Sequence, residues 1–237
     1  MRKSLVALVF VLAACATTGR GDRAVTAPSS SSYIAAAHLD ATRFLPPPPA
    51  PDSPAQAADL AEVKAAQALK GQPRWAQAQR DDETSPYSVF GPVLGPGFVK
   101  ARTPRTAALF EVLFADVKSL TSPAKKAYAR PRPPRVDRSL STCRMLEPSK
   151  SYPSGHASRG WMMALVLSEM APEKADAILA RGRDYGDSRV VCAQHFPSDV
   201  EAGRLIGAAV YAAAEGDPAF QRDFAAARTE LRAALGL

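Results

Sequence analysis

A histidine, an aspartate and an arginine lie close together in residues 188–199, Ser-Arg-Val-Val-Cys-Ala-Gln-His-Phe-Pro-Ser-Asp. His195 has a ring nitrogen that can attack an electrophile, and Asp199 is near enough in sequence to hold the other ring nitrogen and fix its proton. Arg189 offers a planar set of N–H donors suited to phosphate oxygens. Taken alone, Asp199 is equally compatible with a helix cap. Together these residue types indicate a site that handles phosphate.

A helix is expected to begin within this stretch. Ser198 is followed at the third position by Glu201, which is the pattern of a capping box, and apolar residues then recur with helical spacing. His195 would lie just before the helix start, where free N–H groups and the positive end of the helix dipole favour a bound anion. The predicted helix therefore supports the same phosphate site.

A second stretch, Ser-Tyr-Pro-Ser-Gly-His at residues 151–156, has the features of an anion-binding turn. Its proline and Ser154 are expected to open a helix that continues to Met170. Gly155 allows the backbone to come close to a ligand. The N–H groups of this first turn, with the Ser154 hydroxyl, are thus predicted to hold an oxyanion.

A third stretch supplies cations. Lys125 precedes Arg132 by seven residues, which is about two helical turns, so both side chains can project from one face if the helix extends that far. Basic residues in a run usually lie on a solvated surface. We assign that role to Arg130, Arg135 and Arg138.

The three stretches together resemble a family signature: Lys-x6-Arg-Pro, then Pro-Ser-Gly-His, then Ser-Arg-x5-His-x3-Asp. This is the signature of the type 2 phosphatidic acid phosphatase and vanadium haloperoxidase superfamily. The matching positions are Lys125, Arg132, Pro133, Pro153, Ser154, Gly155, His156, Ser188, Arg189, His195 and Asp199. The last stretch and the proline-rich residues 45–53 resemble the bacterial class A nonspecific acid phosphatases. The resemblance covers residues 33–212.

The resemblance implies a metal-independent acid phosphatase that hydrolyses small phosphate monoesters through a phosphohistidine. His195 would be the nucleophile, oriented by Asp199, and His156 would protonate the leaving group. The phosphate-binding residues would be Lys125, Arg132, Ser154, Gly155 and Arg189. No cofactor is expected, and no group of Asp, Glu, His and Cys has the spacing of a metal site.

Three alternatives remain open. A vanadium-dependent haloperoxidase would hold vanadate in the same pocket, with His195 as its ligand. A lipid or diphosphate phosphatase of the same superfamily is a second alternative, although a membrane enzyme of that kind would need several apolar spans that this chain lacks. A phosphate-binding protein of the cell envelope is the third. It would not need both histidines and Asp199.

The N-terminus has the pattern of an export signal. Residues 1–14 contain a basic start and a short apolar run, which predicts a signal peptide. The ending Leu-Ala-Ala before Cys15 resembles a bacterial lipobox, which implies lipidation of that cysteine; ordinary cleavage nearby is the alternative. Residues 15–32 are interpreted as a flexible tether. We therefore expect a periplasmic lipoprotein that contacts the membrane only through its lipid anchor.

The two remaining cysteines, Cys143 and Cys192, are expected to form a disulfide, because exported proteins keep paired cysteines oxidised. Two buried free thiols are the alternative. A bond would connect the segment before the Pro-Ser-Gly-His stretch to the segment that carries His195.

The rest of the chain predicts an all-α, single-domain helical bundle over residues 33–237, and the resemblance implies that it is of the acid phosphatase and vanadium-dependent haloperoxidase type. Pro-initiated helices are expected from Pro54, Pro73, Pro104, Pro123 and Pro218, with another from Pro172 and a loop at residues 91–97. No stretch alternates like a half-buried strand. The formal net charge of +7 could suggest nucleic acid, but the arginines are dispersed and aromatic residues are few, so we expect no nucleic-acid partner. Homo-oligomerisation is left open, and His38 is assigned no role.

Overall fold

The computed structural model describes residues 27–237, and every regular element within that range is helical. The predicted all-α fold is therefore confirmed. The helices are α2 (Ala41–Phe44), α3 (Pro54–Ala66), α4 (Pro73–Arg80), α5 (Pro86–Leu94), α6 (Pro104–Tyr128), α7 (Pro133–Val136), α8 (Gly155–Met170), α9 (Ala175–Val191), α10 (Pro197–Glu215) and α11 (Pro218–Leu235), with 3₁₀ turns at Ala35–Ala37, Gln67–Leu69 and Pro172–Lys174. The predicted signal peptide, Cys15 and most of the predicted tether lie outside the described residues.

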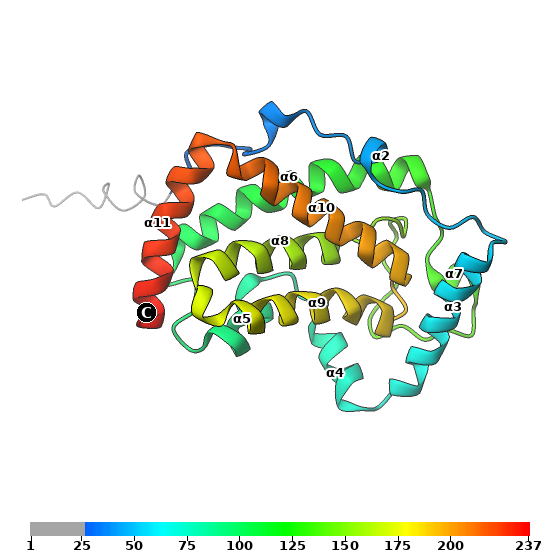
Figure 1. The fold of residues 1–237 in the computed structure, drawn as a ribbon. Helices are drawn as coiled ribbons and strands as arrows, with labels where there is room; N and C mark the ends of the chain where they lie inside the picture. The colour runs from blue at the N-terminus through cyan, green and yellow to red at the C-terminus, as the bar shows by residue number, and fades with distance from the viewer. Residues whose placement is uncertain (1–26) are drawn as a thin grey trace, which may run out of the picture.

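Helix α8 is the centre of the bundle and packs against α9, α10 and α6, while α11 covers the far end of α6 (Figure 1). Its apolar side chains, among them Met162, Met163 and Val166, are completely buried. Figure 1 shows that the C-terminal ends of α6 and α9 and the N-terminal ends of α8 and α10 meet at one end of the bundle. All three sequence stretches that predict phosphate chemistry lie at these four helix ends.

Two glycines allow α10 to lie directly against α8. A Cβ atom at Gly203 would stand 2.5 Å from the carbonyl oxygen of Ser154, and one at Gly207 would stand 2.5 Å from that of Ser158. Such distances are shorter than any van der Waals contact, so a larger residue at either position would force the helices apart. The close approach fixes the first turn of α8 beside the first turn of α10.

Several predicted helix starts are confirmed. Ser53 caps α3 and Asp217 caps α11 through their side-chain oxygens, and a proline follows each cap. Helix α6 begins at Pro104 and α4 at Pro73, with Trp75 on the buried side of α4. Local capping chemistry was sufficient to identify these starts because it depends on neighbours in sequence.

Proline and glycine misled the prediction at three places. Pro123 starts no new helix but lies inside the continuous α6, where buried residues on both sides hold the helix together. Residues 91–94 belong to α5, whose buried Val89, Phe90 and Leu94 compensate for an internal proline, so the loop begins at Gly95. Pro172 opens only a 3₁₀ turn that leads into α9. In the first two cases tertiary packing overrides the local signal.

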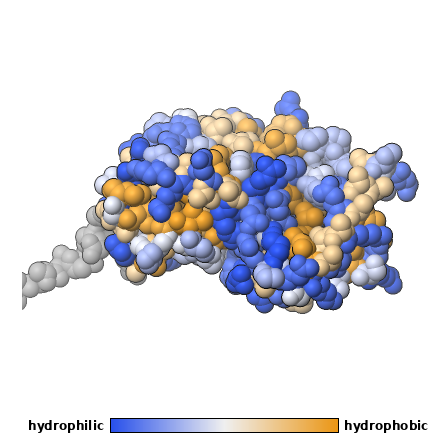
Figure 2. All heavy atoms as spheres, turned by 60° about the horizontal axis from the view of Figure 1, so that its bottom comes forward, coloured by the Kyte–Doolittle hydropathy of each residue, from blue (hydrophilic) through white to orange (hydrophobic). Residues whose placement is uncertain are grey.

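The surface carries both hydrophilic and hydrophobic areas. Figure 2 shows one face on which a band of hydrophilic residues separates two more hydrophobic regions. Among the described helices, none combines the length and the apolar character that crossing a membrane requires.

Candidate active site

The structure brings the predicted site residues together at the end of the bundle where the four helix ends meet. Arg189 lies in the last turn of α9, His195 lies in the short connection to α10, and Ser154 caps α8. The full predicted set at this end comprises Lys125, Arg132, Ser154, Gly155, His156, Arg189, His195 and Asp199. Residues up to 74 positions apart in sequence thereby form one site.

His195 is held in a buried and defined orientation. Its side chain is 1% exposed, and the Nη1 atom of Arg132 lies 3.1 Å from Nε2. Because a guanidinium only donates, Nε2 must accept, and the ring proton is then assigned to Nδ1. Nδ1 lies 3.5 Å from Oδ2 of Asp199, which is an ion-pair distance rather than a hydrogen bond. The arrangement leaves the Nε2 lone pair directed toward Arg132 and the phosphate-binding residues.

Burial lowers the pKa of His195 well below its ordinary value, and the nearby charges of Arg132, Lys125 and Arg189 lower it further. A charged imidazolium at this position would stand close to three cations. The shift favours the neutral imidazole, whose Nε2 lone pair accepts from Arg132 in this structure.

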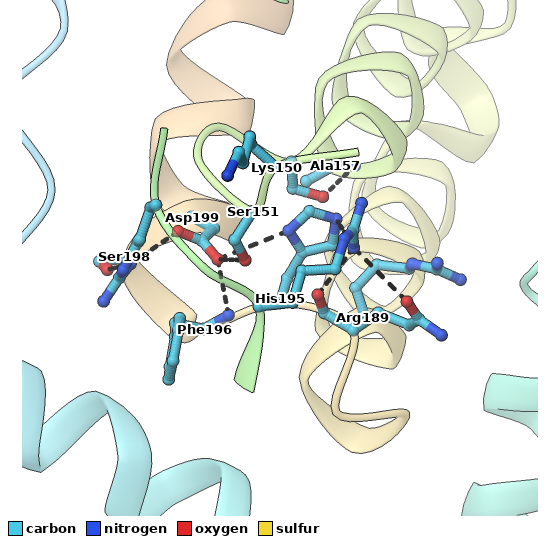
Figure 3. A network of polar contacts seen from close by, with 12 residues as sticks. Lys150, Ser151, Ala157, Arg189, His195, Phe196, Ser198 and Asp199 are labelled. Carbon is cyan, nitrogen blue, oxygen red and sulfur yellow. Dashed lines mark hydrogen bonds and ion pairs between the residues drawn. The ribbon is translucent and has the colours of Figure 1, made fainter. Parts of the chain in front are cut away.

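Asp199 is fixed by three hydrogen bonds in addition to its position beside His195 (Figure 3). Its Oδ2 atom accepts from the Phe196 N–H at 2.8 Å and from the Ser151 hydroxyl at 2.5 Å, and Oδ1 accepts from Arg130 at 2.6 Å. The carboxylate is fully buried. These three donors hold the carboxylate next to the His195 ring.

The predicted cap at Ser198 is wrong. Helix α10 begins at Pro197 with Phe196 as its N-cap, and the side chain of Asp199 bonds back to the Phe196 N–H. The Ser198 hydroxyl instead contacts Asp59 and Arg130. Asp199 thus caps the helix and also lies 3.5 Å from Nδ1 of His195, so one residue occupies the positions of both roles that the sequence left as alternatives.

Arg130 does not lie on a solvated face, so its assignment was wrong. Its guanidinium is buried, pairs with Asp199 and Asp59 at 2.6 and 2.7 Å, and also donates to Gln56. It lies over the Phe196 ring, 4.1 Å from the ring centre. Arg130 therefore connects α3 to the base of the site. The neighbouring arginines at positions 135 and 138 are exposed, as expected.

Lys125 and Arg132 reach the site from different elements, which corrects the prediction that one helix face carries both. Helix α6 ends at Tyr128, and Ala129 adopts the left-handed conformation with φ 49°. The chain turns there, and Arg132 becomes the N-cap of α7. Lys125 donates to the Lys150 carbonyl at 2.5 Å. Burial and the nearby arginines lower the pKa of Lys125 to about 8.

The first turn of α8 forms the third wall. The Ser154 hydroxyl oxygen accepts from the Ala157 N–H at 3.3 Å, so this serine is occupied as the helix cap. The N–H groups of Gly155 and His156 precede that bond and have no intrahelical acceptor. A Cβ atom added at Gly155 would meet nothing within 4 Å. Open space beside Gly155 and N–H groups without intrahelical acceptors therefore coincide in this turn. The Ser154 hydroxyl accepts from Ala157 and can still donate its own proton, as its predicted role requires.

His156 lies at the edge of the site. Its Nε2 atom is 3.2 Å from the carbonyl oxygen of Asp82, and its side chain is partly exposed. Burial among protein atoms and the positive charge of Arg189 lower the pKa of His156 to about 4. The ring is thus neutral in the ligand-free site and can gain a proton when negative charge arrives beside it.

Glu147 was missed by the sequence analysis. Its carboxylate bridges Arg132 at 2.6 Å and Arg189 at 2.7 Å, and Oε1 lies 3.7 Å from Nδ1 of His156. Burial acts to raise the pKa of Glu147, but Arg132, His156 and Arg189 outweigh it and lower the pKa to about 2. No motif surrounds this residue, so only the folded chain reveals it.

Asp82, Glu147 and His156 each place one possible metal-ligand atom within 4.8 Å of the others. Asp82 also pairs with Arg189 at 2.8 Å, and Glu147 pairs with both arginines. A guanidinium next to each carboxylate opposes the binding of a second positive charge. Both carboxylates of this group therefore already have a guanidinium partner.

The predicted disulfide between Cys143 and Cys192 is present. It connects the segment that carries Glu147 to the end of α9, shortly before His195. The bond and its surroundings are buried with Trp75 and Ala78 of α4. The disulfide therefore holds two sides of the site together.

Comparison with known proteins agrees with this site. The sequence profile of the PAP2 superfamily matches residues 106–215, which include every predicted catalytic and phosphate-binding residue and both cysteines of the disulfide. The non-specific acid phosphatase of Salmonella typhimurium is 42% identical over 197 residues, covering 79% of this chain and 78% of the relative. The acid phosphatase of Zymomonas mobilis is 37% identical over 215 residues, covering 87% of this chain and 80% of the relative.

A structural comparison identifies the same fold. The crystal structure of a bacterial vanadium-dependent iodoperoxidase matches 75% of this chain and 53% of its own chain, with a TM-score of 0.60 and 19% sequence identity. At that identity the match concerns the fold alone. The sequence relatives define the activity: the chain belongs to the class A nonspecific acid phosphatases of the PAP2 superfamily, which are phosphoric monoester hydrolases.

Proposed function

We propose that the enzyme hydrolyses small phosphate monoesters in two displacements through a phosphohistidine at His195, without a metal ion. The observation that supports this most strongly is the orientation of the His195 ring. Its Nδ1 faces Asp199 and its Nε2 faces the guanidinium of Arg132, so the lone pair points to where the phosphate would be held. A neutral, buried and oriented imidazole is suited to nucleophilic catalysis.

In the first step, the Nε2 lone pair of His195 forms a bond to phosphorus, and the bond from phosphorus to the ester oxygen breaks. His156 gives a proton to the departing alkoxide. The phosphorylated ring keeps its proton on Nδ1 and becomes positive. Asp199, 3.5 Å away, stabilises that charge.

In the second step, a water molecule attacks phosphorus while neutral His156 accepts its proton. The bond between nitrogen and phosphorus breaks, which restores the lone pair of His195 and releases inorganic phosphate. One histidine thus acts first as acid and then as base. Its ring at the rim of the site is well placed for exchange with both alcohol and water.

Positive charge and N–H donors hold the phosphoryl oxygens during both steps. Arg132 and Arg189 present guanidinium groups, Lys125 presents an ammonium group, and Gly155 contributes an N–H in the first turn of α8, where the space for a Cβ is open. Preorganised donors of this kind stabilise the charge that spreads over the equatorial oxygens in the transition state. This set can supply the stabilisation that a metal ion supplies in other phosphatases.

Metal independence predicts that hydrolysis of p-nitrophenyl phosphate keeps its rate in excess EDTA. The three cationic side chains provide the charge compensation, so removal of divalent ions should change kcat by less than about twofold, well within 1 kcal/mol. The assay compares chelated enzyme with enzyme supplied with Mg²⁺ or Zn²⁺. Lost activity that returns with a divalent ion would contradict the proposal and would point to Asp82, Glu147 and His156.

His156→Ala is expected to slow hydrolysis in proportion to the basicity of the leaving group. An alkyl phosphate, whose alkoxide needs a proton, should lose about 10²–10⁴-fold in the first step. A nitrophenyl ester should lose much less in that step, and phosphoenzyme should accumulate because water activation is also impaired. Rapid-quench measurements on both substrates provide the test. Equal losses for both leaving groups would exclude His156 as the general acid.

A further inference from the structure

The carboxylate of Glu147 occupies donors that the proposed mechanism assigns to phosphate. Oε2 accepts from Nη2 of Arg132 at 2.6 Å, and Oε1 accepts from Nη2 of Arg189 at 2.7 Å. Both guanidinium groups are completely buried. Arg132 also donates to Ser149 and to the Gln194 carbonyl, and Arg189 also donates to Asp82, so Glu147 is the acceptor that the two groups share. An anion that bridges two arginines in this way uses the same charge and geometry that a phosphoryl group would use.

Glu147 differs from Asp199 in its freedom to move, and unlike Asp82 it bridges both Arg132 and Arg189. Its side chain is 30% exposed, whereas that of Asp199 is fully buried and held by three donors. It belongs to the connection between α7 and α8, in which Met145 is 91% exposed and Ser149 and Lys150 are also exposed. Rotation of the Glu147 side chain toward solvent requires no movement of a helix.

We propose that Glu147 is an internal competitor of the substrate: its carboxylate neutralises Arg132 and Arg189 in the free enzyme and leaves them when a phosphoryl group binds. The inference rests on the proposed phosphate site and adds a residue that controls its affinity. Phosphate and the carboxylate cannot both remain ionised on the same two guanidinium groups without strong repulsion. Binding therefore favours protonation of Glu147.

The charges around Glu147 determine the sign of the pH effect. In the free enzyme Arg132 at the start of α7, Arg189 on α9, His156 on α8 and Lys125 on α6 face the carboxylate, and Asp82 shares Arg189 with it. The nearest histidine of the α10 connection, at position 195, also contributes. Together they hold the pKa of Glu147 near 2.

Displacement by an anion removes the two guanidinium contacts and places a negative charge nearby, so the pKa of Glu147 must rise. The complex then binds a proton that the free enzyme does not. Affinity for the anion is highest at acid pH and decreases as pH rises through the pKa of displaced Glu147, above which it becomes constant. This loss of affinity at higher pH adds to the need for a protonated His156 in the first step. Both effects favour activity at acid pH.

Sulfate is a suitable probe because it remains a dianion throughout the working pH range and does not react. Glu147→Gln should bind sulfate at least about tenfold more tightly than wild type near neutral pH, because its neutral amide does not compete for the arginines. A tenfold change in affinity equals the free energy of a shift of about one pKa unit. The two proteins should converge as pH falls. Calorimetry near pH 5 in buffers of different ionisation enthalpy should show about one more proton taken up per sulfate by wild type than by the variant.

A matched control is Glu173→Gln. Glu173 pairs with Arg232 at 2.6 Å on the surface between the turn before α9 and helix α11, so its loss removes a comparable ion pair outside the site. This control should bind sulfate like wild type. Glu147→Ala should reproduce the tighter binding of Glu147→Gln, which excludes an effect of the introduced amide. Circular dichroism verifies that each variant is folded.

The outcomes separate this inference from the proposed function. If Arg189→Ala leaves sulfate affinity unchanged, the anion does not bind at the proposed phosphate site and both proposals fail. If Arg189→Ala abolishes binding but Glu147→Gln binds sulfate equally or more weakly than wild type, only the competitor role fails. A purely structural Glu147 predicts the weaker binding, because loss of its two ion pairs would loosen the arginines.

Discussion

His195→Ala is expected to lower kcat for every phosphate monoester by about 10⁴-fold or more and to eliminate the phosphoenzyme. Loss of a nucleophile removes the covalent route itself, so the effect should not depend on the leaving group. Among the described residues no other side chain combines a neutral ring nitrogen with the contacts to Arg132 and Asp199. The measurement uses radiolabelled substrate, quenched with detergent at alkaline pH because a nitrogen–phosphorus bond hydrolyses in acid.

His38→Ala is the matched control. His38 is exposed at the end of the first 3₁₀ turn, far in sequence from the three stretches, and its replacement should leave both activity and labelling unchanged. The labelled peptide of wild type should contain position 195. Label on a peptide without His195, or a labelled His195→Ala enzyme, would assign the nucleophile to another residue.

Arg130→Met should reduce the free energy of unfolding by about 3–5 kcal/mol, the usual cost of breaking a buried ion pair by removing one partner. The change leaves Asp59 and Asp199 buried without their shared cation. Asp199 also loses one of its three donors, so kcat should fall as the His195 ring becomes less well oriented. Urea denaturation and steady-state kinetics measure the two effects.

Arg135→Met provides the comparison. Arg135 is exposed and lies only five residues from Arg130 in the same basic segment, so its replacement should change stability by no more than about 0.5 kcal/mol. A loss below about 1 kcal/mol for Arg130→Met would mean that Asp59 and Asp199 are stabilised without the guanidinium. The buried pairing would then contribute little to the fold or to the site.

The fold class and the three site stretches could be predicted because their signals are local. Three helix starts are marked by a capping side chain that accepts from an N–H two or three positions later, at Ser53, Ser154 and Asp217. A proline follows two of these caps and strengthens the pattern. The spacing of Arg189, His195 and Asp199 is likewise contained in a short segment. Packing of the helices then brings the three stretches together at one end of the bundle.

Arg130 and Glu147 could not be predicted for the opposite reason. Arg130 is buried because Asp59, far away on α3, and Asp199 on α10 converge on it, and no sequence pattern announces a pairing over 71 and 69 positions. The turn at Ala129 that directs it inward uses a left-handed conformation without a glycine to indicate it. Glu147 lies in an irregular segment whose path depends on the finished fold.

The disulfide between Cys143 and Cys192 limits how far the Glu147 carboxylate can move away from Arg132 and Arg189. Glu147 follows Cys143 closely, and Cys192 precedes His195 closely, so the carboxylate stays within reach of the arginines even when it is displaced. A short tether of this kind corresponds to an effective concentration in the millimolar range. Substrate therefore competes with the Glu147 carboxylate, whose effective concentration does not fall when the enzyme is diluted. The occupancy of the enzyme at a given substrate level then depends on the length of that tether as well as on the contacts in the site.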